Sequence, residues 1–364
     1  MNGKQSVLSA GDVNLDSRCI DFLRCVLIVF VVLIHTNLVA DTSCEDSVYA
    51  RGYDIMGNLL WLCNPLFFAI SGYLFFYSVD FSGKVYAGKM KRRLHSLLVP
   101  YFLWNTIYLL LFSAVYQFAP SAIGPYVVPI QEMGPVDFLR NYFCVYGDSV
   151  FGGPIDGPLW FIRDLMILSV LTPVLYAIIR LHRLTLLLFI ALYLWHPEGV
   201  MLGSLIFFAI GCYLSIWRIN PFTISQKWGW VAIVLFLLCA GVKECLPLQD
   251  GVGLMAVFLL MQLSGMLTLT FLVMCLLQRC PNAFPQTLAK SLFFVFALHS
   301  IIARFLTKTS AAFLMSHQTD ILFYPIVHLA NAIISICCCV LAYLIIYKIS
   351  PSGCKLPDED FCCF

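Results

Sequence analysis

The chain has 364 residues, of which 61% are hydrophobic and only 12% are charged, and its mean hydropathy is +0.88. A water-soluble domain carries about 25% charged residues, so this composition excludes a soluble globule and predicts a protein that faces lipid over much of its surface. The net charge of +2 and the lack of a basic stripe with interleaved aromatic residues exclude a nucleic-acid partner.

Apolar runs long enough to cross a bilayer, which takes about 20 residues, recur along the chain. In chain order, the predicted spans cover residues 19–39, 55–77, 97–118, 158–179, 184–195, 200–217, 228–242, 252–277, 291–306 and 321–347. The run at 184–195 is short, and an interfacial segment there would reduce the count to nine. We predict an all-α, polytopic membrane bundle of about ten helices.

Lysine and arginine residues between the spans predict the orientation, because they concentrate in cytoplasmic loops. With a cytoplasmic N-terminus, most of them fall on the inner side, and the outer loops hold few, such as Arg51, Arg140 and Lys243. This asymmetry favours the even count of ten, with both termini cytoplasmic. We expect a cytoplasmic segment at 1–18, a membrane domain at 19–349 and a cytoplasmic tail at 350–364, in the inner (plasma) membrane.

Ionisable residues inside predicted spans are the strongest functional signal, because such residues are costly in lipid and usually face a cavity or the bundle interior. Asp21 and Arg24 lie three residues apart and can pair on one helix face. Arg24 and His35 lie eleven residues apart, about 16 Å along the same face. This pattern predicts a polar track along the first helix. The alternative is an arginine that reaches the inner interface and a hydrogen-bonded structural histidine.

Other polar features allow both structural and functional interpretations. His299 lies inside the ninth span, and Arg163 and Asp164 open the fourth as an ion pair or as substrate contacts. The basic segment at 82–96 is either an orientation signal or a phosphate-binding patch, and the long outer connection at 119–157 could cover a site. The sequence contains no metal-ligand spacing among its 16 cysteines, so no metal is expected.

Five short stretches together resemble the acyltransferase-3 family of membrane-embedded acyltransferases. One is Ile20-Asp21-Phe22-Leu23-Arg24 followed by His35, which matches the family's Arg-x10-His pattern. The others lie at residues 64–74 (NPLFFAISGYL), 97–101 (LLVPY), 157–161 (GPLWF) and 294–299 (FVFALH). The chain departs from the family's Arg-x-x-Arg before the third helix, since the aligned residues are Arg92 and His95, with Arg93 adjacent.

The resemblance implies transfer of an acyl group, usually acetyl from acetyl-CoA or another acyl-CoA, to a hydroxyl of a carbohydrate or lipid-linked glycan. His35 is the expected general base, supported by Arg24 and Asp21. The residues expected at the CoA donor are Arg24, Arg92, Arg93 and His95. The residues expected at the acceptor are Ser71, Tyr73, Trp160, Arg163, Asp164 and His299. The Ser71-Gly72 pair could instead serve close helix packing.

Two other functions remain open at this level. A transporter or flippase of a lipid-linked sugar would also have many helices and buried charges, but it favours inverted repeats with broken helices, which the sequence does not show. A non-catalytic membrane scaffold would not require Arg24 and His35 to share a face. The sequence leaves open the acceptor, the acyl chain, a direct or acyl-enzyme mechanism, and the oligomeric state.

Overall fold

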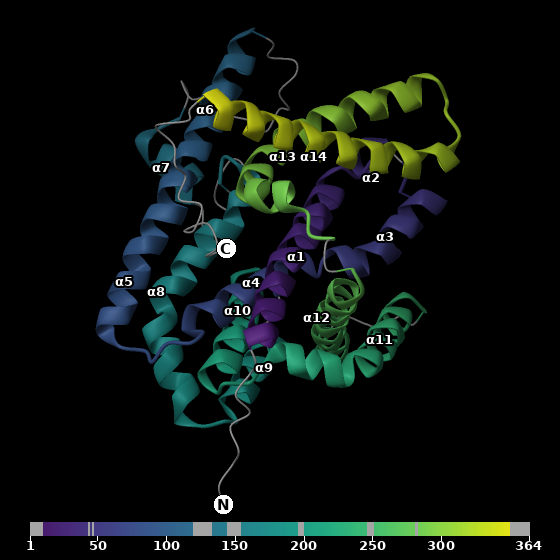
Figure 1. The fold of residues 1–364 in the computed structure, drawn as a ribbon. Helices are drawn as coiled ribbons and strands as arrows, with labels where there is room; N and C mark the ends of the chain where they lie inside the picture. Colours follow the sequence, from purple (N-terminus) through teal and green to yellow (C-terminus); the bar gives the residue numbers. More distant parts are fainter. Residues whose placement is uncertain are drawn as a thin grey trace, which may run out of the picture.

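The computed structural model describes residues 10–42, 44–45, 47–118, 133–143, 154–195, 200–245, 251–280 and 283–349. Every regular element in these ranges is a helix (Figure 1). The predicted tail at 350–364 and most of the connection at 119–157 lie outside the described residues. The first helix begins at Ala10, so the predicted boundary at residue 19 falls within a helix.

The helices follow the predicted spans closely. Within the described ranges, eight helical segments are long and apolar enough to cross a membrane, and shorter apolar helices occupy the positions of the fifth and sixth predicted spans. The helices are α1 (Ala10–His35), α2 (Val39–Thr42), α3 (Val48–Leu60), α4 (Cys63–Phe76), α5 (Gly83–Arg93), α6 (Val99–Phe118), α7 (Pro135–Phe143), α8 (Trp160–Leu181), α9 (Thr185–Trp195), α10 (Val200–Ile216), α11 (Pro221–Cys245), α12 (Val252–Arg279), α13 (Gln286–Ser316) and α14 (Tyr324–Ile349). Short 3-10 turns precede α8 (Gly157–Leu159) and α14 (Ile321–Phe323). The fold is therefore a polytopic helical membrane bundle.

The second predicted span is broken into α3 and α4, which the sequence interpretation did not anticipate. The break falls at Trp61 and Leu62. Pro65 has no backbone N–H to donate to the carbonyl of Trp61, and a proline is tolerated only in the first turn of a helix. The chain therefore ends α3 and restarts as α4, with Leu66 N–H bonded to Leu62 O at 3.1 Å. This irregular backbone lies beside the pocket described below.

A proline also accounts for a local widening of the third span. The segment Leu94–Leu98 is π-helical and joins α5 to α6. Pro100 has no backbone N–H to donate to the carbonyl of Ser96, so the regular α-helical hydrogen bonding is interrupted there. A π-helical turn lets the chain stay helical across the interruption.

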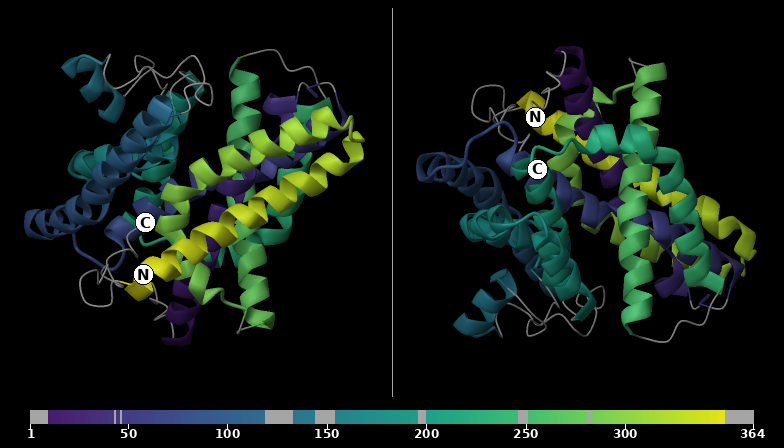
Figure 2. Two further views of the ribbon diagram at one scale, coloured as in Figure 1. Left: turned by 90° about the horizontal axis from the view of Figure 1, so that it is seen from above. Right: turned by 90° about the horizontal axis from the view of Figure 1, so that it is seen from below.

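Helix α1 is the central element of the bundle (Figure 1) and contacts α3, α4, α12, α13 and α14. Beside it, α4 and α10 cross very closely at two glycines. A side chain at Gly72 would overlap the carbonyl oxygen of Phe208, and one at Gly211 would overlap the carbonyl oxygen of Ala69. This confirms that Gly72 serves helix packing. The helices α13 and α14 run side by side in Figures 1 and 2. Helix α13 brings His299 to the end of α1.

Candidate active site

His35 and His299 lie side by side, although 264 positions separate them in the sequence. His35 is the last residue of α1, and His299 lies in the middle of α13. Their ring centroids are 5.0 Å apart, and the ring planes are inclined by 58°. His299 is fully buried, whereas His35 remains solvent-accessible. An accessible imidazole backed by a buried one can exchange a proton with a substrate on its open side.

The hydrogen bonds of His299 determine which ring nitrogen carries its proton. Nδ1 lies 3.1 Å from the carbonyl oxygen of Val295 and 2.8 Å from that of Phe296. Because carbonyl oxygens only accept, Nδ1 must donate, and Nε2 of the neutral ring is then an acceptor. Nε2 is buried and has no hydrogen-bond partner among the described residues. His299 therefore presents a lone pair in the interior, next to His35.

Asp21 and Arg24 lie on the same continuous helix as His35. Arg24 Nη1 lies 3.3 Å from Asp21 Oδ1, and the arginine is only 4% exposed. Eleven helical residues separate Arg24 from His35, which places them about 16 Å apart along the axis and about 20° apart around it. The expected pairing and the shared helix face are both present. We call the two regions of the helix the Arg24 end and the His35 end.

The basic segment packs against α8, and its side chains have different environments. Arg93 is buried, its guanidinium donates to Ser169 Oγ at 2.6 Å and to Ser71 Oγ at 3.3 Å, and it lies over the ring of Phe75. Arg92 and His95 are exposed. The structure thus brings Arg93 into the protein interior and leaves Arg92 and His95 exposed at the surface.

Ser71 and Tyr73, which were expected at the acceptor, do not lie with the two histidines. Ser71 is fully buried and accepts from Arg93. Tyr73 is 8% exposed, and its ring lies 5.3 Å from that of Tyr77, near the end of α4. Both residues lie on α4, which packs against α1 and α10.

Arg163 and Asp164 form an ion pair inside the protein. Arg163 donates to Asp164 Oδ1 from Nε at 3.0 Å and from Nη2 at 2.8 Å, and Ser204 donates to Asp164 Oδ2 at 3.2 Å. Asp164 is fully buried. The pair joins α8 to α10 behind Ser204, which itself lines the pocket described next. Its geometry fits the structural alternative for these two residues.

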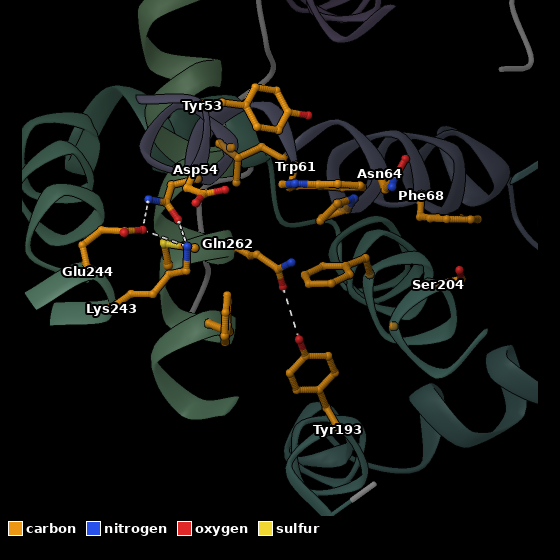
Figure 3. Close-up of a pocket in the computed structure, with 18 of the residues that line it drawn as sticks. Tyr53, Asp54, Trp61, Asn64, Phe68, Tyr193, Ser204, Lys243, Glu244 and Gln262 are labelled. Carbon is orange, nitrogen blue, oxygen red and sulfur yellow. Dashed lines mark hydrogen bonds and ion pairs between the residues drawn. The ribbon is translucent and has the colours of Figure 1, made fainter. Parts of the chain in front are cut away.

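A pocket of about 500 Å³ opens beside the break between α3 and α4 (Figure 3). Trp160, an expected acceptor residue, lines it. The lining combines aromatic rings with amides and charged groups, among them Tyr53, Asp54, Asn58, Trp61, Asn64, Phe68, Tyr193, Lys243, Glu244 and Gln262. This volume and this mixture of groups are typical of a small-molecule site.

Tyr53 connects the pocket to the His35 end. Its hydroxyl donates to the carbonyl oxygen of Ile34, the residue before His35, at 3.3 Å, and it accepts from Asn37 Nδ2 at 3.3 Å. A second connection is a row of rings. Measured between ring centroids, Phe68 and Phe161 are 4.5 Å apart, Phe161 and Phe296 are 6.0 Å apart, and Phe296 and His299 are 6.2 Å apart.

Asp156 is a buried carboxyl near His299 that the sequence interpretation missed. It is fully buried just before α8 and outside the membrane-spanning helices, and its backbone N–H donates to Asn105 Oδ1 at 3.0 Å. Burial raises the pKa of Asp156 well above its ordinary value, against the opposing effect of the hydroxyls of Tyr108 and Ser300. The hydroxyl oxygens of Tyr108 and Ser300 lie 2.5 Å apart, and Ser300 is the residue after His299.

Asp156 lies two residues before the matched stretch at 157–161, but as one of several acidic residues in a long loop it carried no signal of its own. The pocket residues were missed for a related reason. Aromatic and amide side chains near span ends are also typical of the membrane interface. Among the described residues, no group of three or more histidine, cysteine or acidic side chains is placed to hold a metal ion.

Comparison with known proteins identifies the family. The profile of the acyltransferase-3 family, described as an acyltransferase domain, matches residues 17–346. The succinoglycan biosynthesis protein ExoH of Rhizobium meliloti (strain 1021) is 28% identical over 224 residues, which cover 57% of this chain and 56% of that protein. The alignment thus spans little more than half of that relative. No solved structure shows a significant match. The chain belongs to the acyltransferase-3 family.

Proposed function

We propose that the protein is an O-acyltransferase that moves an acyl group, in the first instance acetyl, from acyl-CoA to a hydroxyl of a carbohydrate or lipid-linked glycan. The observation that carries the proposal is the pairing of accessible His35 with buried His299 at 5.0 Å. Family membership supports acyl transfer. The name of the relative, a succinoglycan biosynthesis protein, supports a polysaccharide acceptor.

The reaction needs a base for the acceptor hydroxyl. In the proposed step, one nitrogen of His35 accepts the hydroxyl proton while the oxygen attacks the thioester carbonyl carbon. The new C–O bond forms, the C–S bond breaks, and the proton passes from His35 to the departing CoA thiolate. His299 acts as a positioning residue, because its Nε2 lone pair can accept from the other nitrogen of His35 and hold that ring in the correct tautomer.

The donor enters from the Arg24 end in this proposal. The phosphates of CoA are anionic, and the planar guanidinium of arginine binds phosphate in a bidentate manner. In this proposal the exposed side chains of Arg92 and His95 bind the phosphates, and Arg24 binds the donor from α1. The thin pantetheine arm then has about 16 Å of helix to cover before it reaches His35.

The experiment that tests the function measures free CoA released from acetyl-CoA by purified protein with a panel of glycan acceptors. We expect acceptor-dependent release by the wild type and its loss in His35→Ala. His182→Ala is the matched control, because His182 is exposed at the end of α8. CoA release that survives His35→Ala would show that His35 is not the general base. No CoA release with any acceptor or acyl-CoA would overturn the proposed reaction.

A further inference from the structure

We infer that the pocket beside the α3–α4 break is a binding site for an uncharged saccharide, which places the acceptor at the His35 end. The inference rests on the proposed function, since it assigns the second substrate of that reaction. Three observations carry it: the chemistry of the lining, its charge, and its continuity with the two histidines.

The lining has the two features that a sugar ring requires. A sugar has apolar C–H faces and an edge of hydroxyls that both donate and accept. Trp61, Trp160 and Tyr193 provide flat aromatic surfaces, and the amides of Asn64 and Gln262 both donate and accept. Figure 3 shows Trp61, Asn64 and Phe68 on one side of the pocket, Asp54, Lys243 and Glu244 on the other, and Gln262 between them.

The charge of the pocket selects against anionic ligands. Two carboxylates, Asp54 and Glu244, face one ammonium, Lys243, so the lining carries one net negative charge. The ammonium is already engaged, since Lys243 Nζ lies 2.9 Å from Glu244 Oε1 and 2.8 Å from Asn58 Oδ1. A phosphate or a uronate would meet carboxylates without a free cation. The pocket therefore disfavours CoA as well as acidic sugars.

One wall of the pocket is bonded to the end of α1 that carries His35. Tyr53 lines the pocket and bonds to the carbonyl of Ile34, and Trp61 and Asn64 lie at the break produced by Pro65. Tyr53 thus connects the wall of the pocket to the backbone of the residue before His35. The broken helix thus exposes an irregular segment where it lines a cavity, as happens at binding sites inside membranes.

The test is equilibrium binding of saccharides to the full chain in lipid nanodiscs, because sugar-based detergents would compete for the site. The probes are neutral glucose and galactose trimers and a galacturonic acid trimer of the same length. We expect at least one neutral trimer to bind, and to bind more tightly than the charged one. Trp61→Ala should weaken the binding roughly tenfold, and Trp61→Phe should restore part of it.

Two further variants make the result specific. Trp230→Ala is the control, because Trp230 is 73% exposed on α11 and does not line the pocket, so binding should not change. Asp54→Asn removes a carboxylate, so the charged trimer should bind more tightly and the neutral trimer should be unaffected. Absence of binding by both neutral trimers would overturn the inference, as would binding that is insensitive to Trp61→Ala.

This outcome is separable from the proposed reaction. Binding is measured without an acyl donor, and His35→Ala should leave it unchanged, since His35 does not line the pocket. If neutral trimers bind as expected but no acyl-CoA is consumed, the saccharide site stands and the reaction fails. If acyl-CoA is consumed and Trp61→Ala leaves both the binding and the acceptor KM unchanged, the reaction stands and this site fails.

Discussion

The two ends of α1 differ in charge and in the way their polar groups are satisfied. At the Arg24 end, Arg24 pairs with Asp21, and on the basic segment Arg93 is held by Ser71 and Ser169 while Arg92 is exposed. At the His35 end, the imidazoles of His35 and His299 lie together, and Tyr53 connects the backbone before His35 to a pocket with a net negative lining. This difference agrees with the two substrates that we propose, an anionic donor and an uncharged acceptor.

The largest expected effect is at the His35 end, where the proposed acyl transfer takes place. His35→Ala should lower kcat by about 10²–10⁴, the usual contribution of a general base, and should leave donor binding intact because the Arg24 end is unchanged. Single-turnover transfer and equilibrium binding of acetyl-CoA measure the two effects separately. A variant that loses donor binding together with transfer would contradict the separation of the two ends.

The buried partner should have a smaller and more selective effect. His299→Leu removes the Nε2 acceptor and should lower kcat by roughly 10–100-fold with little change in either KM, because misplacement of a catalytic group acts on the chemical step. His299→Gln keeps an accepting oxygen and should retain most of the activity. Steady-state kinetics of the two His299 variants test this prediction. Equal losses of kcat in His299→Leu and His299→Gln would indicate that His299 has a purely structural role.

Two neighbouring arginines test the Arg24 end. Arg92→Ala should raise the KM for acyl-CoA by about tenfold and leave thermal stability unchanged, since Arg92 is exposed. Arg93→Ala should lower the free energy of unfolding by about 2–3 kcal/mol, because Ser71 and Ser169 lose a charged donor. Donor kinetics and thermal unfolding of both variants measure this. The reverse pattern would assign donor docking to Arg93.

The smallest effect concerns Asp156 at the His35 end. Its pKa is raised by burial, so its neutral form is the one that the fold favours. The stability that it contributes is fully present below the pKa of an unfolded aspartate, about 3.9, and is lost as pH rises through the higher pKa of the folded protein. Asp156→Asn should remove this dependence and be the more stable protein at high pH. Thermal unfolding between pH 4 and 9 measures it, and parallel curves for the two proteins would contradict it.

Much of the bundle follows from composition, because about 20 apolar residues have few alternatives to a membrane helix. In the part of the chain that the structure describes, the apolar helices lie where their runs predict, including the short ones at 185–195 and 200–216. The break at Trp61 was missed, although Pro65 was visible in the sequence. A proline in the first turn of a helix and a proline within a span look alike until the backbone is placed.

The candidate site was predictable where residues share one helix and not where they come together from several. Arg24 and His35 lie on α1, so helix periodicity alone relates them. The proximity of His299 to His35 depends on how α13 packs against α1, and the pocket draws on residues of α3, α4 and α8–α12. Such long-range contacts have no local pattern, and each contributing residue has an ordinary structural interpretation in the sequence.

Sidedness of transfer in sealed proteoliposomes tests the central claim most directly. Acetyl-CoA is supplied on the side of the N-terminus, and a neutral saccharide acceptor is supplied on the same side or enclosed on the opposite side. We expect acylated saccharide only when the acceptor lies opposite the donor, and none in His35→Ala. Product formed only when both substrates share one side would contradict a donor at the Arg24 end and an acceptor at the His35 end.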